Sequence, residues 1–351
     1  MSTQPHARQH ATPPESLTNP PLTPPTGLSL VSHIIEVIKN RREGRDLTNT
    51  PWLVYSLDLK GYQQLQYELE RDESLWGFVQ DKLRYDYFPS VCRLVIRRPT
   101  HLHEQVINMI VMDIGAQLKS IRDRPTKDRS AEFASKISSG RSATINFIDE
   151  KYSKHDPDEQ FRHQKAQFPG VVIEVSDSQK RKDLGRLADD YILGSDGDIR
   201  VVVGVDIGCR DSKKATLSVW RPKIITNQAG ENELVSHLTV NQVFREPDGK
   251  PTLSRTGGLQ LRLRDFATEA LAEDSLRDPI ILSPDKLYSI LQDAEDATSV
   301  VVQQTGMMRT NKPWIRKQSR DSSPVEELAH GDEERFRADE SRAEDQTMKT
   351  S

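Results

Sequence analysis

Residues 170–176 read Gly-Val-Val-Ile-Glu-Val-Ser, and this stretch decides how the fold is interpreted. It is an almost continuous apolar run, which is typical of a strand that is buried on both faces of a sheet. An ionised carboxylate is costly in such a strand unless it is paired or bound to a metal ion. The stretch therefore predicts a central buried strand and marks Glu174 as a candidate functional residue.

The neighbouring segments predict a central sheet flanked by helices. Apolar residues with helical spacing predict helices over 106–118 and 180–193, and residues 199–205 form a second apolar run. We expect paired strands over 85–97, a loop or an excursion from the main domain over 122–142, a strand over 215–220 and two strands over 231–244. This alternation predicts a mixed α/β (α+β) domain with a mixed central β-sheet.

Composition divides the chain into four parts. Residues 1–27 are rich in Pro and Thr and predict a disordered tail. Residues 28–84 are expected to form a helical extension packed on the core, and residues 85–300 the main domain. Residues 301–351 turn polar and acidic, which predicts a second disordered tail.

Charge does not decide the class of partner. The 351 residues carry a net charge of -4, with 35% hydrophobic and 29% charged residues. From Gln318 to Ser351 there are ten acidic and five basic residues, so the remainder is close to +1. A body of that charge neither attracts nor repels nucleic acid strongly, and local patches must decide.

The chain has the features of an intracellular protein. It has two cysteines, too few for a disulfide framework. The first 28 residues lack the apolar core of a signal peptide, and no run of about 18 apolar residues predicts a membrane span. We expect a cytoplasmic or nuclear protein without membrane contact, and homodimer formation stays open.

Three acidic residues are candidates for chemistry. Asp158 follows Pro157, Glu174 lies in the apolar strand, and Glu104 lies at the start of the helix that contains residues 106–118. One interpretation is structural, with Glu174 capping the strand end and pairing with a lysine or arginine. The other is a site for Mg²⁺ or Mn²⁺, which prefer oxygen ligands and can hold a phosphate oxygen while activating a water.

The order of these motifs resembles the PD-(D/E)XK restriction-endonuclease-like superfamily. Asp158 and Glu174 are sixteen residues apart, and Val175 and Ser176 follow Glu174. The wider pattern is similar to a bacterial branch of predicted endonucleases with a Pro-Ser/Thr-x-x-His helix start, a Pro-Asp pair, a strand ending Glu-Val-x-Ser, a helix and a strand ending in Asp. The matching residues here are Pro99, Thr100, His103, Pro157, Asp158, Glu174, Val175, Ser176, Asp183, Tyr191 and Asp206.

The resemblance implies a restriction-endonuclease-like core and a divalent-metal site. Asp158 and Glu174 match the acids that bind the metal ion in that superfamily. Glu104 matches a helix acid that completes the site in many members, and the backbone carbonyl of Val175 is a further expected ligand. The implied cofactor is Mg²⁺ or Mn²⁺, and the implied partner is DNA or RNA.

The motif lysine is absent from its usual places. Ser176 stands where Glu-x-Lys requires lysine, and Leu187 stands where the bacterial branch carries it. Such a lysine orients the attacking water and offsets transition-state charge. Lys180 or Lys182 is expected to substitute, although both also suit the solvated start of a helix.

Basic residues near the acids predict a surface that faces phosphate groups. The candidates are Arg97, Arg98, Lys180, Arg181 and Arg186. Ordinary surface charge is the alternative for each of them. His101 and His103 lack the spacing of a zinc pair on a helix, so His103 and His155 are better placed as hydrogen-bond partners of the acids.

Three hypotheses follow. The first is a metal-dependent nuclease with a displaced lysine, and the second is an inactive module of the same fold that binds nucleic acid or another partner. The third is an unrelated α/β protein whose acids are structural, in which case Glu104, Asp158 and Glu174 would not converge. No Gly-x-Ser-x-Gly, phosphate-binding loop or dinucleotide pattern occurs.

Overall fold

The computed structural model describes most of the chain between residues 29 and 303. The described ranges are 29–45, 52–126, 128–149, 152, 154–176, 183–208, 212–254 and 256–303. They all belong to the unit formed by residues 1–305. The two tails predicted for residues 1–27 and 301–351 therefore lie almost wholly outside the described residues.

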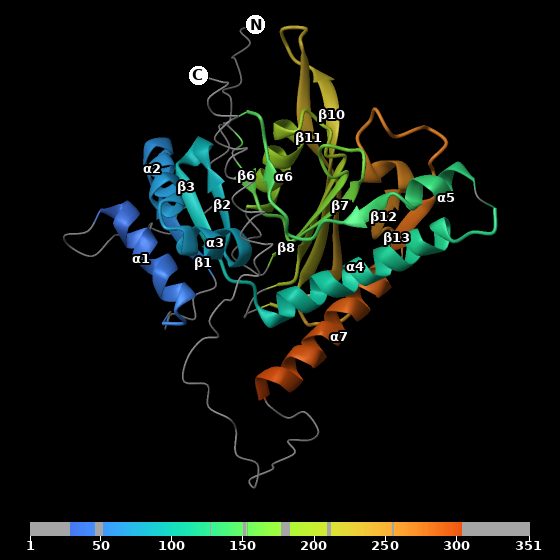
Figure 1. The fold of residues 1–351 in the computed structure, drawn as a ribbon. Coiled ribbons are helices and arrows are strands. Elements are labelled where there is room, and N and C mark those ends of the chain that lie inside the picture. Colours follow the sequence, from blue (N-terminus) through green and yellow to red (C-terminus); the bar gives the residue numbers. More distant parts are fainter. Residues whose placement is uncertain are drawn as a thin grey trace, which may run out of the picture. The chain divides into compact units, whose positions relative to one another are not determined.

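A three-stranded sheet covered by three helices forms the N-terminal part (Figure 1). Its elements are α1 (Leu30–Arg42), β1 (Trp52–Ser56), α2 (Leu59–Glu70), α3 (Glu73–Lys82), β2 (Arg84–Phe88), the 3-10 turn η2 (Pro89–Val91) and β3 (Arg93–Arg97). The central β3 pairs antiparallel with both neighbours, so Trp52 and Arg84 both lie opposite Arg97. β1 and β3 pair along their whole length, so residues on both sides of position 84 share this sheet.

The central sheet has six strands in the order β11-β10-β9-β8-β7-β4. Their bounds are β4 Ile137–Ser139, β7 Glu159–His163, β8 Val171–Ser176, β9 Val201–Asp206, β10 Ala215–Thr226 and β11 Asn232–Arg245. Only β8 and β9 are parallel, and α6 (Leu184–Gly194) makes the crossover that a parallel pair requires. Both strands are buried at every position, as their apolar runs predict.

Helices cover both faces of this sheet. The side chains of Val171, Ile173 and Val175 pack with α4 (His101–Arg122) and α7 (Pro284–Gln303), which lie side by side in Figure 1. Val172 points to the other face and packs with α6 and with part of the N-terminal sheet. Because side chains alternate along a strand, Glu174 lies on the α6 face with Val172.

Shorter elements complete the unit. They are α5 (Arg129–Ala134), the two-stranded pair β5 (Ile145–Asn146) and β6 (Lys154–His155), the pair β12 (Leu259–Arg262) and β13 (Pro279–Leu282), and the 3-10 turn η4 (Leu263–Phe266). The β12–β13 pair packs on the same core as α4 and α7.

The structure confirms the mixed α/β class and the two buried strands, and it corrects two local expectations. Residues 231–244 form one strand rather than two, because β11 extends with β10 as a long ribbon whose exposed end tolerates polar residues. Residues 122–142 are not one loop. Asp128 caps α5 by accepting a hydrogen bond from the Ala131 amide at 2.8 Å, and β4 pairs with β7.

Candidate active site

Asp158 and Glu174 lie at the same end of two neighbouring strands. In the antiparallel pair β7–β8, the last paired residues at this end are Glu159 and Ile173. Asp158 and Glu174 are the next residues of the two chain segments, so they follow directly beyond this pair. Both residues are buried, and the Val175 amide donates to Asp158 Oδ2 at 2.8 Å. The sheet therefore brings together the two acids that are sixteen residues apart in sequence.

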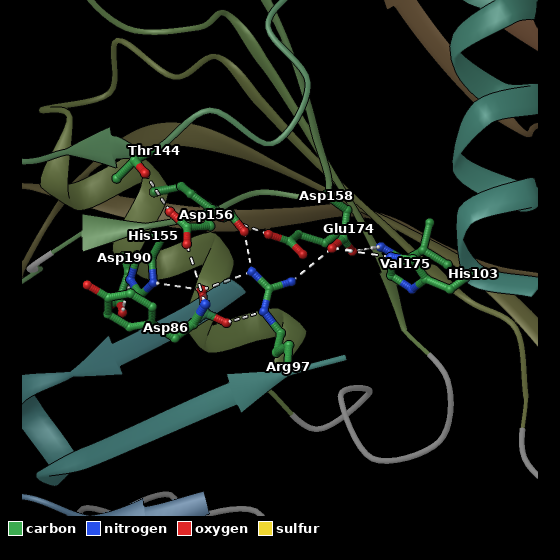
Figure 2. A network of polar contacts seen from close by, with 12 residues as sticks. Asp86, Arg97, His103, Thr144, His155, Asp156, Asp158, Glu174, Val175 and Asp190 are labelled. Carbon is green, nitrogen blue, oxygen red and sulfur yellow. Dashed lines mark hydrogen bonds and ion pairs between the residues drawn. The ribbon is translucent and has the colours of Figure 1, made fainter. Parts of the chain in front are cut away.

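Arg97 is the cation at this pair of acids (Figure 2). Its Nη1 lies 2.8 Å from Asp158 Oδ1, and its Nε lies 2.8 Å from Asp86 Oδ2. Its Nη2 also donates to the Asp156 carbonyl oxygen. Burial disfavours the charged form, but the carboxylates of Asp86 and Asp158 outweigh it and raise the pKa of Arg97. Arg97 is thus a buried, permanently charged link between β3 and the acids.

The start of α4 brings a histidine, rather than the predicted glutamate, to Asp158. Thr100 caps the helix by accepting a hydrogen bond from the His103 amide at 3.2 Å. His103 Nε2 lies 3.3 Å from Asp158 Oδ1. Glu104 pairs instead with Arg84 at 3.3 Å, and its side chain is 46% exposed. Adjacent helical residues point about 100° apart, so one turn cannot direct both side chains to the same place.

His155 extends the network behind Arg97. Its Nδ1 lies 3.4 Å from Asp86 Oδ1, and its Nε2 lies 3.0 Å from Asp190 Oδ2. Burial opposes the charged ring, but Asp190 and Asp86 together raise the pKa of His155 to about 9. Thr144 donates to Asp156 at 2.7 Å beside it. The histidines expected as partners of the acids, His103 and His155, both join this network.

Tyr191 on α6 holds Glu174. The Tyr191 hydroxyl donates to Glu174 Oε1 at 2.7 Å, and both side chains are buried. Burial and the nearby Glu174 charge raise the pKa of Tyr191 well above its usual value, so the phenol stays a donor. Tyr191 is therefore a core residue that also fixes the orientation of one acid.

The two usual positions of the motif lysine hold Ser176 and Leu187, which have other contacts. Ser176, at the motif position, donates to Asp206 Oδ1 at 3.1 Å, and Leu187 is buried in the core on the α6 side. The candidates Lys180, Arg181 and Lys182 lie outside the described residues, which omit 177–182. Their predicted roles remain predictions.

The other basic candidates lie around this network. Arg98 is exposed and lines a pocket of about 230 Å³ together with Arg41 and Lys82. Arg186 on α6 donates to Ser90 Oγ at 3.2 Å.

The donor set has the chemistry of a divalent-metal site, but its oxygens already have donors. Carboxylate oxygens suit Mg²⁺ and Mn²⁺. Oδ1 of Asp158 faces Arg97 and His103, and its Oδ2 accepts from Val175. Among the residues that the structure describes, no three His, Cys, Asp or Glu side chains are grouped to hold a metal ion. An ion at Asp158 would therefore replace the Arg97 guanidinium.

Comparison with known proteins adds no relative. No family model matches the chain, and no curated protein matches it. None of the helices in the described part of the chain has the length and apolar character that crossing a bilayer requires.

Proposed function

We propose that the chain is a divalent-metal-dependent nuclease of the PD-(D/E)XK type. The observation that supports this proposal is the placement of Asp158, directly before β7, beside the end of β8 that carries Glu174, where the Val175 amide donates to Asp158 Oδ2. Around them lie the helix that starts after Pro99-Thr100, the crossover helix α6 and the strand β9 that ends in Asp206, in the order that the sequence resemblance predicts. The third hypothesis was an unrelated α/β protein in which the acids do not converge. The closeness of Asp158 and Glu174 argues against that hypothesis for these two residues.

Each residue has a specific task in this proposal. Asp158 and Glu174 would hold Mg²⁺ or Mn²⁺, with the Val175 carbonyl as a further ligand, and the bound ion would supply Lewis-acid chemistry for phosphate and water. Tyr191 fixes Glu174 through its hydrogen bond, and the Val175 amide fixes Asp158. Glu104 remains the proposed additional acid, although it pairs with Arg84 here. Lys180 or Lys182 supplies the positive charge that Ser176 cannot.

Cleavage of plasmid, linear duplex and single-stranded nucleic acid with Mg²⁺ or Mn²⁺ tests this proposal. We expect Glu174→Gln to lower the rate on the order of 100-fold or more, the scale of removing one electrostatic contact to the transition state. Glu159→Gln is the matched control, because Glu159 is also buried and its acceptor contacts to Ser139 and Arg141 can be kept by an amide oxygen. Equal cleavage by both variants would refute the assignment of Glu174.

A second candidate is a module that keeps the fold and binds nucleic acid without cleaving it. The Arg97–Asp158 ion pair and Ser176 at the lysine position favour this candidate. For this candidate, the folded wild-type protein should not cleave nucleic acid in the presence of metal ions. Its titration with Mn²⁺ should also show no saturable heat of binding that depends on Glu174, so wild type and Glu174→Gln should give the same titration. Calorimetric titration with Mn²⁺, next to the cleavage assay, separates the two candidates.

A further inference from the structure

A cavity lined by arginines lies at the opposite end of the central sheet from the acids. It has a volume of about 590 Å³ and is bordered by strands of the sheet and by the β12–β13 pair. The arginines that line it are Arg200, Arg221, Arg262, Arg264 and Arg277. Along the parallel pair β8–β9, Val171 lies opposite Val201 and Glu174 opposite Gly204. Arg200, before β9, is thus about 13 Å along the strands from Glu174, at about 3.3 Å per residue.

One wall of this cavity is held rigidly. Asp265 receives two hydrogen bonds from Arg221, at 3.0 Å from Nη1 and 2.9 Å from Nη2. The same carboxylate accepts the Arg262 amide at 2.9 Å. A bidentate arginine–carboxylate pair fixes the plane of the guanidinium. Asp265 is buried, so Arg221 and the backbone at Arg262 form a pre-arranged surface.

The remaining arginines leave positive charge available. Arg200 pairs with Glu269 at 3.4 Å and Arg264 with Asp274 at 2.6 Å, and these two carboxylates are 78% and 85% exposed. Exposed pairs of this kind are weak and can be exchanged for a stronger anion. The side chains of Arg262 and Arg277 have no ion-pair partner within the described part of the chain. The five arginines are therefore balanced by three carboxylates, those of Asp265, Glu269 and Asp274, and a net charge of two positive units remains at the cavity.

We propose that this cavity binds phosphate groups and seats the backbone of a nucleic-acid strand. Guanidinium groups match phosphate oxygens in geometry as well as charge, and the volume is within the range of sites for small ligands. The site would position a strand without reading its bases, as phosphate contacts generally do. This inference needs neither the acids nor a metal ion, so it goes beyond the proposed cleavage.

Fluorescence anisotropy with labelled single-stranded DNA and RNA, in the presence of EDTA, tests this site. The variant is Arg262→Gln with Arg277→Gln, because both side chains are exposed and lack ion pairs. The matched control is Arg71→Gln with Arg122→Gln, two exposed arginines on other elements. We expect the affinity of the first variant for the labelled strand to be at least tenfold lower than that of wild type, and the affinity of the control to be unchanged. A plot of log K against log salt concentration has a negative slope, and its magnitude should decrease by about 1.4 in this variant, because two arginines are removed and each phosphate contact with a single strand contributes about 0.7.

Two further measurements define the outcome. Competition with ADP and inorganic phosphate distinguishes the source of the phosphate. If only these two probes bind saturably, and the first variant loses this binding, the cavity is a phosphate site for free phosphates or nucleotides. Unchanged affinity and salt slope in that variant, or no binding of any probe by wild type, overturns the proposal. Binding is measured in EDTA and cleavage requires a metal ion, so a failed cleavage assay and a failed phosphate site remain distinguishable.

Discussion

Arg97 and Asp158 join two sheets that share no strand, with Nη1 of the arginine 2.8 Å from Oδ1 of the aspartate. Arg97 ends β3 of the three-stranded sheet, and Asp158 immediately precedes β7 of the central sheet. The guanidinium therefore stabilises the junction through the carboxylate of Asp158. If a metal ion binds Asp158 as proposed, it would compete with Arg97 for this carboxylate, and the competition can be measured.

Loss of the Arg97 charge should destabilise the protein strongly. We expect Arg97→Gln to lower the free energy of unfolding by about 3–5 kcal/mol, because the buried carboxylates of Asp86 and Asp158 lose a shared cation. Arg122→Gln is the control, since the Arg122–Asp123 pair is exposed and its loss should leave the free energy of unfolding nearly unchanged. Urea unfolding followed by circular dichroism measures both. A cost below about 1 kcal/mol for Arg97→Gln would contradict a structural role.

Mn²⁺ should rescue the same variant if the nuclease proposal is correct. A ligand that binds only the folded protein raises its stability with concentration. With the competing guanidinium removed, we expect Mn²⁺ to raise the melting temperature of Arg97→Gln more than that of wild type. Arg98→Gln should respond as wild type does, because Arg98 is exposed and does not contact Asp158. Equal shifts in all three proteins would argue against an ion at Asp158 and favour the non-cleaving module.

Stability should fall at alkaline pH through His155. Its pKa is about 9 in the folded protein and about 6.5 in an unfolded chain. The folded state thus holds the proton more tightly, so its contribution is complete below pH 6.5 and is lost as the pH rises through 9. The difference amounts to roughly 3 kcal/mol at about 1.4 kcal/mol per pH unit. Urea unfolding at pH 6 and at pH 9.5 measures this loss of stability. Wild type should show it in full, and His155→Gln should show a much smaller loss. His237→Gln is the control and should behave as wild type does, because His237 is exposed.

Removal of the Tyr191 hydroxyl should lower the free energy of unfolding, because the buried Glu174 carboxylate loses a hydrogen-bond donor. Tyr191→Phe deletes the 2.7 Å hydrogen bond to Glu174 Oε1 and keeps the ring. We expect a loss of about 1.5–3 kcal/mol, the scale of a hydrogen bond to a charged group. Tyr67→Phe controls for the chemistry of the change, because Tyr67 is 60% exposed. If the two variants unfold at the same urea concentration, the phenol does not support Glu174.

Glu104 separates the sequence prediction from the contact seen in the structure. Its ion pair with Arg84 is partly exposed, so Glu104→Gln should change the free energy of unfolding by no more than about 1 kcal/mol. If Glu104 completes a metal site, the same variant should weaken Mn²⁺ binding and slow cleavage while its stability stays near that of wild type. Unchanged Mn²⁺ affinity would assign Glu104 to the surface pair alone. His103→Gln then tests whether His103, at 3.3 Å from Asp158, carries the role instead.

The sequence by itself determined the parts of this protein that depend on local pattern. The apolar runs fixed β8 and β9 as fully buried strands, and the position of Glu174 within such a run marked it as a residue needing a partner. The resemblance of Pro157-Asp158 and Glu174-Val175-Ser176 to the superfamily motif implied that the two acids share a site, and the Val175 amide, next to Glu174, donates to Asp158. These features follow from strand periodicity and burial cost, which act over a few residues.

Only the tertiary structure decided which charges meet. Arg97 lies 61 positions before Asp158, and nothing in its local sequence distinguishes a buried counter-ion from the surface cation it was predicted to be. The rotation of α4 selected His103 over Glu104, a choice set by how the helix packs rather than by composition. The arginine-lined cavity gathers residues from 200 to 281, and none of them forms a motif. Long-range packing sets such contacts, because a side chain's partner depends on which surfaces the whole core brings together.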